Sequence, residues 1–254
     1  MERFRAGDLA GVRAGKGPRL LLAHPIVFSK AFWALDLFAE RFEVAAFDQR
    51  GHGESPAEGI DLDTMADDIG RVLDHLGWER AVVGGTSLGA ATTLRFAMRH
   101  PERVTLLVQD LPGFGPGSHR DAERTGRMTE AFATGDLDEA ARRTVEGLSP
   151  HRAKAWEAAL RSDWGNYEAA SIGPKIAAAL RGTAGWRIVE RWPDDLAHLA
   201  VPTSILALDG DPAHPYDVAR TMARTIPDAK LIPRVPSLSP AAIARQWMEV
   251  IHGR

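Results

Sequence analysis

The sequence predicts an α/β protein with a mainly parallel central sheet, flanked by helices and carrying a helical lid insertion. Short apolar runs alternate with helical patterns from residue 19 onward, and this alternation stops between about residues 113 and 199. Such alternation is typical of parallel sheets whose strands are joined by helices. The length of 254 residues and the hydrophobic content of 44% fit one large domain with a sizeable core.

Six short apolar runs predict the strands, at residues 19–24, 44–48, 81–85, 104–110, 203–209 and 229–235. Helical patterns between them predict helices near residues 30–41, 64–76, 88–99, 216–225 and 240–251. Apolar runs of this length, bounded by turn residues, fit strands that are buried on both faces. We therefore expect a core domain formed by residues 1–112 and 200–254.

Residues 113–199 are expected to form a helical lid, or cap, inserted in this core. Turn residues at 112–117 open the segment, and Pro202 follows it where the sheet resumes. Four of the seven tryptophans lie in the segment: Trp156, Trp164, Trp186 and Trp192. They either pack the insertion onto the core or form an aromatic surface over an apolar pocket. In the second case Trp156, Trp164 and Trp186 are the candidate substrate-binding residues.

Composition limits the classes of partner and cofactor. A net charge of -3 gives no electrostatic reason to expect nucleic acid or an anionic membrane as partner, and no stretch is long enough to span a bilayer. Cysteine is absent, the histidines lack the spacing of a zinc helix, and no G-x-G-x-x-G turn follows the first strand. We expect a cytoplasmic protein without metal or cofactor that acts on a small-molecule substrate. The oligomeric state stays open.

The most informative segment is Gly-Thr-Ser-Leu-Gly at residues 85–89, between an apolar run and a helical run. A serine in a sharp strand-to-helix turn has a strained backbone, and flanking glycines let the strand and helix approach closely. This nucleophile elbow presents the hydroxyl at a helix N-terminus, where unpaired amides carry partial positive charge. Ser87 is therefore the candidate nucleophile.

Three further segments occur in order around this elbow: Leu-Leu-Leu-Ala-His-Pro at 20–25, Asp-Gln-Arg-Gly-His-Gly-Glu-Ser at 48–55, and Val201-Pro202 leading to Asp-Gly-Asp-Pro-Ala-His-Pro at 209–215. With them the chain resembles the α/β-hydrolase superfamily over nearly its whole length. The resemblance implies that Ser87 is the nucleophile and that Asp211 orients a catalytic histidine. It also implies that the backbone amides of Ile26 and Leu88 form an oxyanion hole.

The histidine that the resemblance leads one to expect after the last strand is missing. Residues 232–240 read Ile-Pro-Arg-Val-Pro-Ser-Leu-Ser-Pro, and no histidine lies between His214 and His252. Ser237 takes the equivalent position and cannot accept the proton of Ser87 as an imidazole would. The triad is therefore predicted to be incomplete. We expect Ser87 to donate a hydrogen bond rather than attack, and a histidine introduced at position 237 to raise esterase activity.

Three residues are candidates for related roles near Ser87. His214 follows the acid in its loop and either replaces the missing base or caps the next helix at the rim. His24 lies beside the oxyanion loop, where it holds the loop backbone or takes part at the substrate. Asp110 ends the strand before the insertion and is either a loop-start aspartate or a carboxylate that reaches the substrate and supplements Asp211.

Three classes of function remain open at this stage. The first is a hydrolase of a small, apolar or polycyclic carbonyl compound, such as an ester, a lactone or a quinone-like compound. The second is a lyase, isomerase or carbon-carbon bond-forming enzyme of natural-product biosynthesis that uses the oxyanion hole. The third is a catalytically silent binding protein or an inactivated variant.

Overall fold

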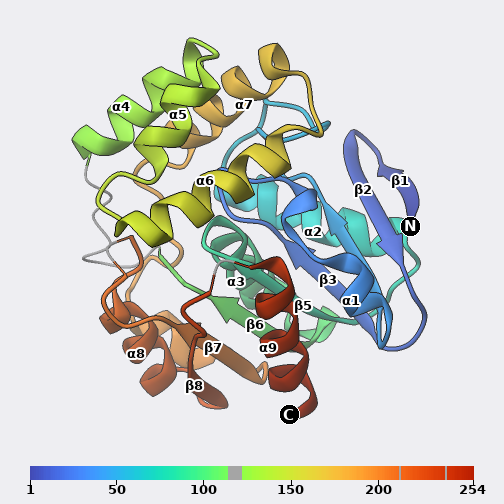
Figure 1. The fold of residues 1–254 in the computed structure, drawn as a ribbon. Coiled ribbons are helices and arrows are strands. Elements are labelled where there is room, and N and C mark those ends of the chain that lie inside the picture. Colours follow the sequence, from blue (N-terminus) through green and yellow to red (C-terminus); the bar gives the residue numbers. More distant parts are fainter. Residues whose placement is uncertain (114–121, 212, 238) are drawn as a thin grey trace.

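The computed structural model describes all residues except 114–121, 212 and 238, and within them an eight-stranded sheet forms the centre of the molecule (Figure 1). Its strand order is β1-β2-β4-β3-β5-β6-β7-β8. The strands are β1 (Glu2–Ala6), β2 (Leu9–Ala14), β3 (Arg19–Ala23), β4 (Glu43–Phe47), β5 (Ala81–Thr86), β6 (Val104–Asp110), β7 (Thr203–Ala207) and β8 (Ala229–Pro233). All pairs from β4 to β8 are parallel. The predicted α/β class and its six strands are confirmed.

Helices cover both faces of the sheet (Figure 1). One face carries α1 (Leu35–Ala39) and α9 (Pro240–His252), and the other carries α2 (Leu62–His75), α3 (Leu88–Arg99) and α8 (Tyr216–Thr225). Strand β3 contributes side chains to the apolar clusters on both faces of the sheet, because successive side chains of a strand point to opposite faces. Leu20 and Leu22 join the apolar cluster under α1 and α9, while Leu21 joins the cluster under α2, α3 and α8.

The N-terminal hairpin is the part of the sheet that the sequence prediction missed. Strand β1 pairs with β2 antiparallel, and Ala6 faces Leu9 across the two-residue turn Gly7-Asp8. Gly7 has φ 66°, which a residue with a side chain adopts only at a cost. A glycine-containing pair between two alternating runs is a hairpin signal, so the sequence did contain the information.

The helix expected over residues 30–41 is divided in two. A short 3-10 turn, Lys30–Phe32, precedes α1, and Trp33 between them is extended, with φ -89° and ψ 133°. Ser29 caps the 3-10 turn, since its side chain accepts a hydrogen bond from the amide of Ala31. Phe32 and Trp33 are both buried, and packing of these rings accompanies the break in the helix.

Between β6 and β7 the described residues form helices joined by turns and loops, with no strand among them. It contains α4 (Ala122–Ala133), α5 (Leu137–Thr144), α6 (Pro150–Trp164), α7 (Ala169–Gly182) and a 3-10 segment, Asp194–His198. Helix α7 lies directly on the core loop of residues 51–60, where Lys175 Nζ donates to the carbonyls of Gly53 and Ser55 at 2.8 Å and 2.9 Å. Most of the turn expected at residues 112–117 lies outside the described residues. No helix in the described ranges is both long and apolar enough to cross a membrane.

Candidate active site

Ser87 occupies a strained turn between β5 and α3, with φ 53° and ψ -106°. A Cβ atom on Gly85 would lie 2.3 Å from the carbonyl carbon of Gly89, and one on Gly89 would lie 2.1 Å from the carbonyl oxygen of Ala23. Both positions therefore require glycine for strand and helix to pack this closely. The amide of Ser87 donates to the carbonyl of Asp110 at 3.0 Å, which ties the turn to β6.

The imidazole of His214 lies between Ser87 and Asp211. Its Nε2 is 3.0 Å from Ser87 Oγ, and its Nδ1 is 3.0 Å from Asp211 Oδ1. A proton on Nδ1, donated to the carboxylate, leaves the Nε2 lone pair directed at the serine hydroxyl. The structure thus brings together three of the four residues that the sequence proposed as catalytic.

The acid and the imidazole come from one loop between β7 and α8. Asp211 Oδ1 also accepts hydrogen bonds from the amides of Ala213, at 2.9 Å, and His214, at 3.1 Å. The carboxylate therefore stabilises the conformation of its own loop. Through the same oxygen it orients the imidazole of His214, three residues later. Aspartate often closes turns in this way, by bonding backbone amides a few residues on.

The amides expected to form the oxyanion hole are those of Ile26, in the loop after β3, and Leu88, the first residue of α3. Within the described part of the chain, neither amide donates a hydrogen bond to a protein acceptor. The first amides of a helix have no partner inside the helix. Both amides therefore keep a free donor among the described residues, as the predicted oxyanion hole requires.

His24 holds the backbone of the oxyanion loop. It is fully buried, its Nε2 accepts the amide proton of Gln49 at 2.9 Å, and its Nδ1 therefore donates to the carbonyl of Pro25 at 2.9 Å. Burial lowers the pKa of His24 well below its ordinary value, followed in effect by the nearby His52. The expectation that His24 contacts substrate is corrected, because no part of its side chain is accessible.

His52 contacts the carbonyl of Ile26 through Nε2 and that of Arg50 through Nδ1, at 3.0 Å for the second contact. The ring packs edge-on against His24, with centroids 4.7 Å apart. Two buried imidazoles thus support the loop that carries the Ile26 amide.

Asp110 and Ser237 differ from their sequence-based roles. Asp110 is fully buried, and its Oδ1 accepts from Arg234 Nε at 2.7 Å while its Oδ2 accepts from Thr86 Oγ1 at 2.9 Å. Arg234 Nη1 also donates to the carbonyl of Ser237 at 3.1 Å. Both carboxylate oxygens of Asp110 are thus used inside the protein, which corrects its assignment as a substrate-binding residue.

The hydroxyl of Ser237 accepts from the amide of Ser239 at 3.2 Å. No described contact joins it to Ser87 or Asp211. The assignment of Ser237 to the catalytic group is therefore corrected: its loop is held by Arg234, a residue that sequence reasoning did not weigh. The sequence analysis did not consider that a buried carboxylate at Asp110 needs a cationic partner. No local pattern in the sequence indicates that Arg234 is this partner.

The three tryptophans proposed to bind substrate have different environments. Trp164 is buried, and its indole donates to the carbonyl of Val27 at 2.8 Å. This position corrects its assignment to substrate binding and fits the alternative in which tryptophan packs the insertion onto the core. Trp156 is partly buried and lies edge-on to Phe28, with centroids 5.0 Å apart. Trp186 is partly buried and packs against both apolar clusters.

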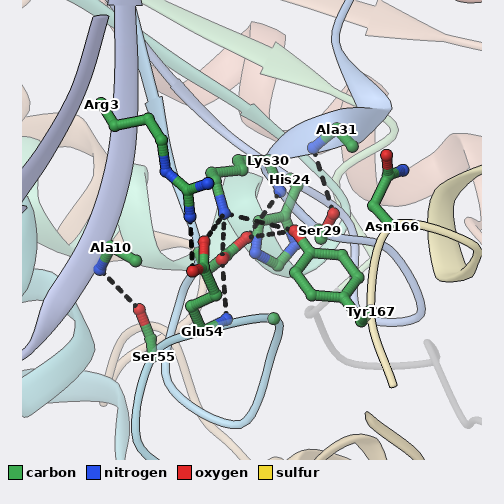
Figure 2. A network of polar contacts seen from close by, with 12 residues as sticks. Arg3, Ala10, His24, Ser29, Lys30, Ala31, Glu54, Ser55, Asn166 and Tyr167 are labelled. Carbon is green, nitrogen blue, oxygen red and sulfur yellow. Dashed lines mark hydrogen bonds and ion pairs between the residues drawn. The ribbon is translucent and has the colours of Figure 1, made fainter. Parts of the chain in front are cut away.

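Polar contacts around Lys30 include the hydroxyl of Tyr167, which belongs to the segment after α6 (Figure 2). Lys30 Nζ lies 2.6 Å from Asp48 Oδ2 and 3.3 Å from the hydroxyl of Tyr167, which follows α6. Burial alone would lower the pKa of Lys30, but the negative charge of Asp48 and its hydrogen bond outweigh burial, so the pKa lies above its ordinary value. Lys30 thus keeps its positive charge.

Asp163 connects α6 to the loop after Ile26. Its Oδ2 accepts from the amide and the hydroxyl of Ser29, at 3.2 Å and 3.1 Å. Burial raises the pKa of Asp163 to about 7, and its Oδ1 has no hydrogen-bond partner among the described residues. The sequence gave no indication of this contact, because it joins residues 134 positions apart.

A family model described as the alpha/beta hydrolase fold matches residues 20–236. The match covers the sheet from β3 to β8, the elbow, the insertion and the loop that carries Asp211 and His214. The chain therefore belongs to the α/β hydrolase family, whose relatives here are hydrolases, as the resemblance noted in the sequence led us to expect.

Relatives and solved structures agree with this assignment. The AB hydrolase superfamily protein YisY of Bacillus subtilis is 29% identical over 205 residues, covering 76% of this chain and 72% of that protein. A putative carbamate hydrolase, RutD of Caulobacter segnis, is 38% identical over 95 residues, covering 35% of this chain and 36% of that protein. The enol-lactonase of Burkholderia xenovorans superposes with a TM-score of 0.75 at 19% identity, covering 96% of this chain and 95% of that one.

Proposed function

We propose that the protein is a serine hydrolase of small carboxylic esters or lactones, in which Ser87 attacks, His214 is the base and Asp211 orients it. The observation that carries this proposal is the 3.0 Å contact between His214 Nε2 and Ser87 Oγ. The sequence left open whether His214 replaces the missing base or caps the next helix, and this contact supports its role as the base.

Each step of the proposed reaction uses a group already described. Ser87 Oγ bonds to the carbonyl carbon while its proton passes to His214 Nε2, and Asp211 stabilises the resulting imidazolium. The carbonyl oxygen becomes an oxyanion that accepts hydrogen bonds from the amides of Ile26 and Leu88. His214 then gives the proton to the departing alkoxide. A water molecule then attacks the acyl carbon while His214 takes its proton, and the bond from Ser87 Oγ to that carbon breaks as His214 returns the proton to Oγ, which releases the acid and restores the enzyme.

The proposed substrate has an apolar acyl group. Trp156 of the insertion is partly buried and packs edge-on against the buried ring of Phe28, two residues after Ile26, so one partly exposed aromatic ring adjoins the loop that carries Ile26. Aromatic side chains offer large apolar surfaces to a ligand. The similar solved structures include an enol-lactonase and a thermophilic esterase, and the names of both enzymes denote activity on ester-type bonds.

Pre-steady-state kinetics with p-nitrophenyl butyrate tests this proposal. An acyl-enzyme mechanism gives a burst of p-nitrophenol that approaches one equivalent per chain when deacylation is slow, and Ser87→Ala abolishes both burst and turnover. In the polarising alternative, Ser87→Ala retains about 0.1% to 10% of the rate, the effect of losing one oxyanion donor, and no acyl-enzyme is trapped. Residual turnover of that size, with no acyl adduct on Ser87 by mass spectrometry, contradicts the proposal.

A further inference from the structure

The imidazole of His214 lies against the backbone of Gly113, three residues past the end of β6. A Cβ atom on Gly113 would lie 2.7 Å from His214 Cδ2 and 3.5 Å from His214 Nε2. Contacts below 3.0 Å are essentially never seen for real Cβ atoms, so any side chain at this position must displace the ring. The φ angle of Gly113 is not in the left-handed region. The requirement for glycine therefore comes from the imidazole and not from the backbone.

A strained residue brings Gly113 to this position. Leu111 has φ 49°, and among the described residues it and Ser87 are the non-glycine residues with positive φ. Ser87 directly follows β5 and Leu111 directly follows β6. The last residues of these two neighbouring strands, Thr86 and Asp110, are paired. The Leu111 amide donates to the carbonyl of Leu206 in β7 at 2.9 Å, and its side chain is buried. Strain of this kind persists where the surroundings fix it, and it concentrates at functional sites.

We propose that Gly113 is a positioning residue for the proposed base: it leaves the space in which the His214 ring lies and limits rotation of that ring away from Ser87. The inference rests on the proposed function. Asp211 fixes the ring at Nδ1 and Ser87 meets it at Nε2, while Gly113 supplies the surface against the Cδ2 edge.

Gly113→Ala tests the inference, with Gly126→Ala as the matched control. Gly126 lies in α4, and a Cβ there would meet no atom within 4 Å. We expect Gly113→Ala to lower kcat for p-nitrophenyl butyrate about 100-fold, the effect of misplacing a catalytic group by about 1 Å, with KM changed much less. Labelling of Ser87 by a fluorophosphonate slows by a similar factor. Gly126→Ala keeps the activity of the unmodified protein.

A double-mutant cycle with His214→Ala separates this role from a general effect on folding. If Gly113 acts through the imidazole, Gly113→Ala causes no further loss of labelling rate in the His214→Ala background. Its effect on thermal unfolding also disappears there, because the atom that it would collide with is gone. This stability cycle remains informative if Gly113→Ala alone is poorly folded, since the double variant then regains its fold.

The possible failures are distinguishable. Equal losses from Gly113→Ala in both backgrounds, or full activity of Gly113→Ala beside an inactive His214→Ala, overturn the inference and leave the proposed function standing. Full activity of His214→Ala overturns the proposed function itself.

Discussion

At the scale of single residues, the position of His214 depends on one carboxylate oxygen. Asp211 Oδ1 accepts two backbone amides of its own loop and the imidazole of His214. The sequence predicted Asp211 as the orienting acid and His214 as one candidate for the base. It could not predict that the ring turns inward to Ser87, because this depends on the conformation of a short loop and on the space above Gly113.

Asp211→Asn should reduce kcat strongly without unfolding the protein. An amide can donate to Nδ1 and so hold the tautomer with the proton on Nε2, which is the wrong one for a base facing Ser87. We expect a loss of about 10,000-fold in kcat, measured with p-nitrophenyl butyrate. Asp209→Asn is the control, since Asp209 is exposed. A loss below tenfold for Asp211→Asn would show that the acid lies elsewhere.

Ser237→His should give no gain in esterase activity, in contrast to the expectation from the sequence. The place next to Ser87 Oγ is already taken by His214 Nε2, and Arg234 holds the backbone of Ser237. Initial rates on p-nitrophenyl acetate, with the fold checked by circular dichroism, measure the effect. A clear increase would indicate that position 237 faces the serine and that His214 is not the base.

At the scale of elements, an ion pair joins the ends of β6 and β8. The side chains of Asp110 and Arg234 are 0% and 3% exposed, and the pair links the turn at Ser87 to the loop after β8. Removing one partner of a buried pair leaves the other charge uncompensated. The resemblance led us to expect the catalytic histidine in the loop after β8. In this chain Arg234 of that loop instead stabilises the turn at Ser87 through its ion pair with Asp110.

Arg234→Met should destabilise the protein by about 3 to 5 kcal/mol, the usual cost of leaving a buried charge without its partner. Urea unfolding at pH 7 measures this change. Adding Asp110→Asn removes the stranded charge, so the double variant should recover part of the loss. A cost below about 1 kcal/mol for Arg234→Met, which is typical of exposed pairs, would mean that the pair is solvated.

Burial of the Asp163 carboxyl group in α6 should make stability depend on pH. Because the pKa of Asp163 is raised to about 7 in the folded state, the folded protein holds a proton that the unfolded chain releases near pH 4. Its contribution is full below about pH 4 and is lost as pH rises to about 7. Relative to Asp163→Asn, the unmodified protein should therefore lose unfolding free energy between pH 4.5 and 7 and then stay level. Parallel urea curves at pH 4.5, 6 and 8 test this, and a constant difference would contradict it.

At the scale of the whole molecule, the sheet was predictable and the polar supports of the site were not. Strands β3 to β7 are mostly buried apolar runs, and such runs carry their own signal, whereas the edge strand β8 is only partly buried. The residues Ser87, Asp211, Ile26 and Leu88 follow from motifs at strand ends. Contacts such as Asp163 with Ser29, or Asp110 with Arg234, join segments more than 100 residues apart, and only the folded chain brings them together.

The central claim is that His214 is the base for Ser87, and the rate of fluorophosphonate labelling tests it most directly. This reaction needs a nucleophilic serine and no knowledge of the natural substrate. His214→Gln keeps a polar side chain of similar size without a basic nitrogen, and His198→Gln, at an exposed histidine of the insertion, is the control. We predict a fall of about 100-fold to 10,000-fold in the labelling rate for His214→Gln, the usual contribution of a general base, and no change for the control. Equal labelling rates in all three proteins would contradict the account.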